Sequence, residues 1–92
     1  MKLKIALVET EGTPFALAVV REDVLDSETE REAAREFYEG KIFRDLPVVL
    51  VGENYLTAPR FYGEKELSKF MQGVKMEMIE WTELDYPKPL LN

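Results

Sequence analysis

The chain has 92 residues, of which 18 are acidic and 12 basic, giving a formal net charge of -6. This length predicts one domain, residues 1–92, because a chain of this size buries enough surface to form a core without cross-links. The absence of cysteine and histidine excludes disulfides, thiolate nucleophiles, imidazole bases and most zinc sites. Only carboxylate, lysine, arginine and hydroxyl chemistry remains.

The distribution of charge argues against several classes of partner. Lysine and arginine are interspersed with glutamate along the chain, so no basic patch is set apart for nucleic acid. No uncharged run approaches the roughly 20 residues needed to cross a bilayer, and the first residues lack a signal-peptide core. We therefore expect a cytoplasmic protein without nucleic-acid or membrane partners. Abundant glutamate with few amide side chains is a thermophile-like composition.

Two strands are predicted at the start of the chain. Residues 2–8 alternate between two faces, which is typical of a half-buried strand. After turn residues 9–14, residues 15–20 are continuously apolar, which indicates burial on both faces. Too few residues separate these segments for a helix, so we expect an antiparallel hairpin.

A helix is predicted after the hairpin. Ser27 and Glu30 fit a capping box, in which each side chain accepts a hydrogen bond from the other residue's backbone. The helix should run to about Glu39 and be closed by Gly40. Its predicted apolar stripe consists of Ala33, Ala34, Phe37 and Tyr38.

The second half of the chain predicts two more strands, a helix and a last strand. The apolar stretch 46–52 suits the middle of a sheet. Residues 58–62 contain Pro59, which cannot donate to a ladder and so predicts an edge strand. Residues 63–73 suggest a short helix, and residues 74–81 a strand with a bulge. A folded body of residues 1–84 should precede an irregular tail, residues 85–92, which contains two prolines.

The element order β-β-α-β-β-α-β predicts an α+β fold, α/β-like, with a single mixed five-stranded sheet and two helices. A ferredoxin-like arrangement of residues 15–81 would place the Pro59 segment in the sheet centre, where it fits badly. We favour the alternative in which residues 15–20 and 48–51 are parallel neighbours joined by a right-handed crossover, with residues 58–62 at the edge.

Three segments resemble the last third of thioredoxin and glutaredoxin chains: Leu46–Val51, Arg60–Gly63 and Glu66–Leu67. They share a proline before a central strand, a hairpin, a glycine and a helix. Those families also carry a redox cysteine motif and connect their first two strands through a helix, and this chain has neither. The resemblance therefore implies a sheet layout only, and thiol redox activity is excluded.

Polar residues follow both predicted parallel strands, where ligands bind in open sheets. Three carboxylates and an amide oxygen suit a hard cation such as Mg²⁺, although the identity of any metal stays open. Arg60 suits a carboxylate or phosphate, with Tyr55 and Tyr62 as walls. Solvated turn residues and a surface ion pair are the alternative interpretation. The candidate ligand-binding residues are Glu22, Asp23, Glu53, Asn54, Tyr55 and Arg60.

Aromatic and methionine residues concentrate in the last third of the chain, and such residues are enriched in interface cores. The candidate interface residues are Met76, Met78, Trp81, Tyr86, Leu90 and Leu91. Completion of the monomer's own core is the alternative interpretation of the same residues.

Catalysis finds little support in the sequence. Ser27 is expected to cap a helix, Ser68 lies within one, no histidine serves as base, and the glycines form no phosphate motif. We therefore expect a non-catalytic module without a cofactor that self-associates as a homodimer or binds another protein. A small-molecule or anion-binding domain and a carboxylate enzyme dependent on a divalent metal remain the alternatives.

Overall fold

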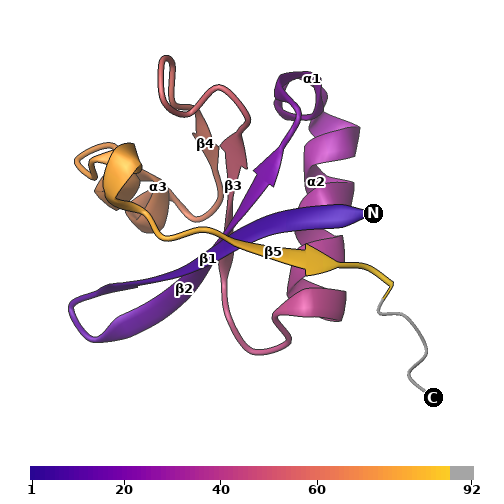
Figure 1. The fold of residues 1–92 in the computed structure, drawn as a ribbon, viewed down its shortest axis with the longest axis horizontal. Helices are drawn as coiled ribbons and strands as arrows, with labels where there is room; N and C mark the ends of the chain where they lie inside the picture. The colour runs from indigo at the N-terminus through magenta and orange to yellow at the C-terminus, as the bar shows by residue number, and fades with distance from the viewer. Residues whose placement is uncertain (88–92) are drawn as a thin grey trace.

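Five strands form one mixed sheet in the computed structural model, which describes residues 1–87 (Figure 1). The strands are β1 Lys2–Thr10, β2 Thr13–Val20, β3 Val48–Gly52, β4 Phe61–Tyr62 and β5 Thr82–Asp85. Their order in the sheet is β4-β3-β2-β1-β5, with β2 and β3 parallel and every other neighbouring pair antiparallel. The predicted α+β architecture, its parallel pair and the edge position of β4 are confirmed.

The β1–β2 hairpin has its tip at the lower left of Figure 1 and closes through a two-residue turn. Thr10 pairs with Thr13, and the two residues between them, Glu11 and Gly12, have φ angles of 49° and 79°. Positive φ at both positions is the signature of a type I′ turn, whose twist matches that of the paired strands. The predicted antiparallel hairpin is therefore present.

Helices connect β2 to β3 on one face of the sheet. They are α1 Glu22–Leu25 and α2 Glu28–Phe37, and α2 continues into a π-helical segment, Tyr38–Ile42. The one-turn helix α1 adds to the two predicted helices. The predicted helix end at Gly40 is wrong, because this glycine lies inside the π-helical segment and the chain turns away only at Phe43.

The opposite face carries α3 Lys65–Met71 and a 3₁₀ turn, Met76–Met78. The strand predicted at residues 74–81 is wrong, since this segment crosses the sheet face and the last strand begins at Thr82. Met76 and Ile79 both pack on the core there. Their spacing of three residues suits a 3₁₀ turn, which repeats every three residues, better than a strand.

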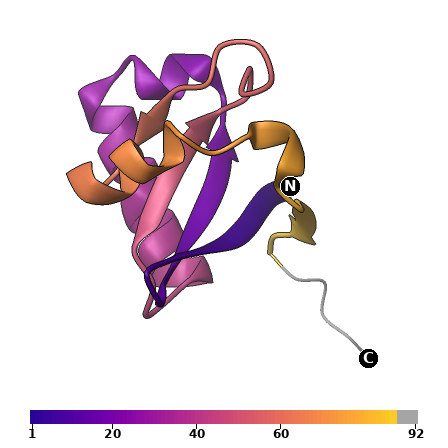
Figure 2. The ribbon, with the colours of Figure 1, turned by 90° about the vertical axis from the view of Figure 1, so that its left-hand side faces the viewer.

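The core occupies both faces of β2 and β3, which run side by side (Figure 2). One face buries Phe15, Leu17, Val49 and Val51 with Leu67 and Met71 of α3. The other buries Ala16, Ala18, Val48 and Leu50 with Leu25 and Tyr38. Burial on two sides explains why these two strands are apolar without alternation. No helix within residues 1–87 has the length and apolarity needed to span a membrane.

Candidate functional site

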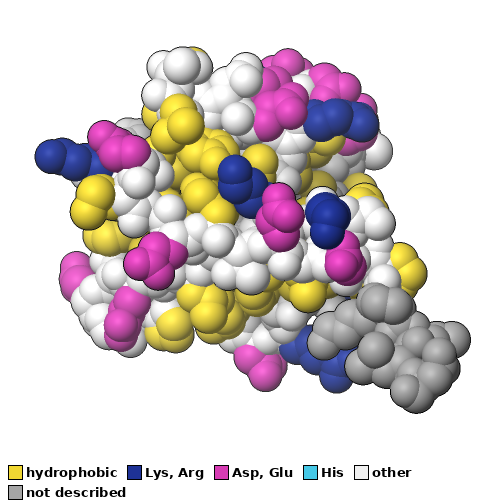
Figure 3. Space-filling view, in the orientation of Figure 1, with side chains coloured by type: hydrophobic (Ala, Val, Ile, Leu, Met, Phe, Trp, Pro, Cys, Tyr) yellow, Lys and Arg dark blue, Asp and Glu magenta, His cyan; other side chains and the backbone are white. Residues whose placement is uncertain are grey.

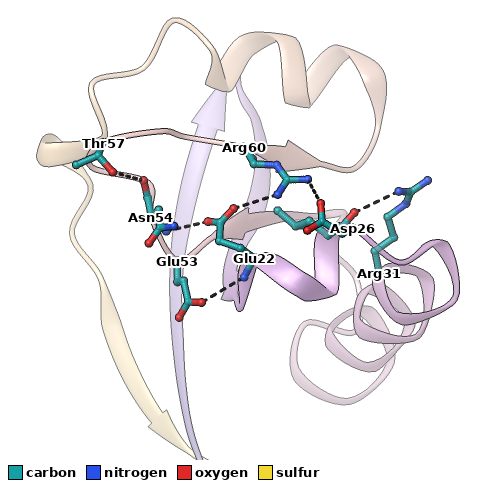
Figure 4. Close-up of polar contacts among 8 residues, drawn as sticks. Glu22, Asp26, Arg31, Glu53, Asn54, Thr57 and Arg60 are labelled. Carbon is teal, nitrogen blue, oxygen red and sulfur yellow. Dashed lines mark hydrogen bonds and ion pairs between the residues drawn. The ribbon is translucent and has the colours of Figure 1, made fainter.

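The carboxyl ends of β2 and β3 form the first candidate site. Because these strands are parallel, the chain leaves both at the same edge of the sheet. The structure thereby brings Glu22, which follows β2, to Glu53 and Asn54, which follow β3 (Figure 4). Arg60, just before β4, reaches the same place.

Backbone and side-chain hydrogen bonds join the two loops. Glu22 Oε2 accepts a hydrogen bond from the Asn54 N–H at 2.9 Å, and Glu53 Oε2 accepts one from the Glu22 N–H at 3.3 Å. Each loop therefore supplies a carboxylate to an amide of the other loop. This exchange ties the β2–α1 connection to the β3–β4 connection.

Two carboxylates hold Arg60. Its Nη1 donates to Glu22 Oε1 at 3.2 Å, and its Nη2 donates to Asp26 Oδ1 at 2.7 Å. The pKa of Arg60 is raised, chiefly by the hydrogen bond to Asp26. The chain's own carboxylates therefore already neutralise the guanidinium. An incoming anion would have to displace them to bind Arg60.

Asp26 is a member of this cluster that sequence analysis missed. It lies four residues after Glu22, so the two residues face the same side of a helical turn. That spacing was the available signal. Two predicted members lie elsewhere: Asp23 accepts a hydrogen bond from Arg21 Nε at 3.1 Å, and Tyr55 is buried with its ring 5.0 Å from that of Trp81.

The acidic residues of the cluster do not converge on one point. Within residues 1–87, no group of three acidic side chains has a geometry that could hold a metal ion. The oxygens of Glu22 face N–H donors instead. The predicted wall residue Tyr62 lies outside this cluster, since its hydroxyl donates to Glu32 and so joins β4 to α2.

The outer edge of β1 forms the second candidate site. β1 has nine residues, but β5 pairs only with Lys2–Ile5. From Ala6 to Thr10, no strand among the described residues pairs with this edge. An unpaired edge offers backbone donors and acceptors to another chain.

The register of the hairpin shows which backbone groups face that edge. Leu7 lies opposite Ala16, whose N–H donates instead to Pro47 O at 2.9 Å on the other side of β2. Glu9 lies opposite Pro14, which has no N–H. The pairs Leu7–Ala16 and Glu9–Pro14 are therefore non-hydrogen-bonded pairs of the antiparallel ladder. The N–H and C=O groups of Leu7 and Glu9 consequently point away from β2, toward the open edge.

Exposed apolar surface accompanies the open edge. Leu7 is 68% exposed and Met78 is 73% exposed. One hollow is lined by Leu7, Val8, Met78, Ile79, Glu80 and Thr82, and another by Ile5, Ala6, Leu7, Phe43 and Thr82. Figure 3 shows hydrophobic side chains at the surface on this side of the molecule. An added strand would therefore find both backbone groups and apolar surface.

The residues predicted for an interface have different environments. Met78 is exposed in the hollow beside Leu7, whereas Met76 is buried in the core. Trp81 is half-buried beneath the Lys4 ammonium, which lies 5.8 Å from its ring, and Tyr86 packs on Phe37 with ring centroids 5.1 Å apart. Leu90 and Leu91 lie outside the described residues.

Leu7 was not among the predicted interface residues, because its alternation with Leu3 and Ile5 predicted a buried side chain. It is on the same face as these residues, but no helix within residues 1–87 covers that end of β1.

A scan against protein-family models finds no match to this chain, and searches of curated proteins and of solved structures find none either.

Proposed function

We propose that this chain is a non-catalytic interaction module that self-associates through the open edge of β1. The observation that carries the proposal is the unpaired segment from Ala6 to Thr10, with the backbone of Leu7 and Glu9 directed outward. Strand addition at such an edge is a common mode of protein recognition. A homodimer in the cytoplasm, with neither nucleic acid nor membrane as partner, is part of the same proposal, supported by the interspersed charges.

The opposite edge of the sheet supports this choice by contrast. β4 has only two residues, and the Val48 N–H beyond it donates to Glu39 Oε2 at 3.1 Å. The same carboxylate accepts from Arg35 Nε at 3.2 Å. A short edge strand and a side chain that occupies a free amide are both ways to prevent strand addition. The segment Ala6–Val8 has no charged residue or proline that would protect it in this way.

Light scattering after size-exclusion chromatography tests the proposal. We expect the native chain to show twice its mass of 10.7 kDa. Leu7→Glu should shift the equilibrium toward monomer at least tenfold, because it adds an acidic charge to an already acidic chain where the strand would add. The side chain is exposed, so circular dichroism should show an unchanged fold.

Leu56→Glu is the matched control. Leu56 is 67% exposed, nearly the same as Leu7, but lies on the β3–β4 connection. It should leave the mass unchanged. A native chain that stays at 10.7 kDa at every concentration tested would contradict self-association, and an equal effect of both substitutions would contradict the assignment to β1.

A further inference from the structure

Resting on the proposed function, we propose that the open edge takes residues 6–10 of a second copy's β1, antiparallel and with Val8 on the twofold axis. In this register Leu7 lies opposite the second copy's Glu9, and Val8 lies opposite the second copy's Val8. The two sheets then join into one continuous sheet through both copies.

The backbone directions select this register. A hydrogen-bonded antiparallel pair forms only between residues whose N–H and C=O groups both face the partner. On the open edge these residues are Leu7 and Glu9, as the hairpin register shows. Pairing each Leu7 with the other copy's Glu9 uses all of these groups in both copies.

The two neighbouring symmetric registers are less favourable. Centring the axis on Leu7 would direct Glu9 to Ile5 of the other copy, which β5 already pairs through Thr82. Centring it on Glu9 would place two glutamates directly opposite each other, and like charges in that position are destabilising. It would also direct Leu7 to Glu11, which lies in the turn with a φ of 49°.

The side chains also fit a second copy as the occupant. In the register centred on Val8, no acidic residue of the segment 6–10 faces another, and the small Ala6 lies opposite Thr10. The segment Ala6–Val8 is uncharged and extended, so it has the character of a strand that adds to an edge. Each copy contributes its open β1 edge, so the twofold contact closes at a dimer.

Cysteine cross-linking tests the register without background, because the chain has no cysteine. The two Val8 residues would form a non-hydrogen-bonded pair with Cα atoms about 4.5 Å apart. This separation is within the range of about 4.4–6.8 Å that disulfides span. Val8→Cys should therefore form a covalent dimer on mild oxidation.

Two further variants serve as matched controls. Leu7→Cys and Glu9→Cys should each cross-link poorly alone, at least tenfold less than Val8→Cys. Like residues there are displaced by two positions, roughly 7 Å along the strand, in addition to the strand spacing. An equimolar mixture of the two should cross-link efficiently, because Leu7 of one copy lies opposite Glu9 of the other. Light scattering of each reduced variant should show a dimer.

The outcomes separate this inference from the proposed function. A native dimer in which Leu7→Cys or Glu9→Cys links to itself most efficiently would overturn the register. A native dimer in which neither Val8→Cys nor the mixture cross-links would overturn β1 pairing. A monomeric native chain would overturn the proposed self-association as well. If Val8→Cys alone disrupts the reduced dimer, the mixed pair decides the register.

Discussion

Gly52 allows the loops at the ends of β2 and β3 to be joined. A Cβ atom at this position would lie 2.2 Å from Glu22 Oε2, the atom that accepts the Asn54 N–H hydrogen bond. The glycine is required here by the close approach of a carboxylate to the backbone and not by a left-handed φ. The Glu22–Arg60 contact depends on the same placement of the carboxylate.

We expect Gly52→Ala to lower the free energy of unfolding by about 1 kcal/mol, since Glu22 must give up its hydrogen bond to Asn54. In a Glu22→Ala background the same substitution should have almost no cost, because the clashing side chain is gone. Urea denaturation of the double-mutant cycle measures this coupling. Gly40→Ala is the control, since a Cβ there meets no atom of the described part of the chain within 4 Å. Equal losses in both backgrounds would refute the explanation.

The first turn of α2 is held by a side-chain cap. Ser27 Oγ accepts the Glu30 N–H at 3.2 Å, which is one half of the predicted capping box. The other half is absent, because the Ser27 N–H donates to Val24 O, at 3.3 Å, at the end of α1. The additional helix α1 therefore replaces the contribution of the Glu30 side chain.

Ser27→Ala should destabilise the protein by about 1 kcal/mol through loss of the α2 N-cap. Ser68→Ala provides a matched control in α3, because the buried Ser68 Oγ has no hydrogen-bond partner among residues 1–87. That substitution should be neutral or stabilising, since it removes a buried polar atom that has no partner. Thermal unfolding of the two variants gives the comparison, and equal destabilisation would count against the cap.

The strands β2 and β3 could be predicted from sequence because their burial is uniform. Both faces of β2 and β3 are covered, so an uninterrupted apolar run was sufficient evidence. The segment before β5 was mispredicted because the packing of Met76 depends on its position across the sheet, which local alternation does not report. The strand-end cluster followed from topology, whereas its Asp26 contact required knowledge of α1.

At the scale of the whole molecule, charge opposes association of two copies. Each copy carries a formal net charge of -6, so a dimer brings together two acidic bodies. The proposed contact contains one charged residue of each copy, Glu9, which lies opposite Leu7, so most of the repulsion acts at long range between charges outside the contact. Long-range repulsion between solvent-exposed charges is screened by salt.

The dimer should therefore tighten as salt is added. We expect the dissociation constant to fall several-fold between about 0.01 and 0.15 M ionic strength, where the Debye length drops from about 30 to 8 Å. Sedimentation equilibrium at several salt concentrations measures this change. A dissociation constant that rises with salt would instead indicate an interface held by ion pairs.

The position of Pro14 restricts how the length of this chain can vary. Exposed hairpin tips usually tolerate insertions and deletions. Here a chain that gained or lost one residue between Thr10 and Thr13 would shift the hairpin register. Pro14, which has no N–H, would then occupy a position that must donate a hydrogen bond to β1, or the outward-facing N–H and C=O of Leu7 would turn toward β2. Homologous chains that keep this assembly should therefore vary in the side chains of the turn but not in its length.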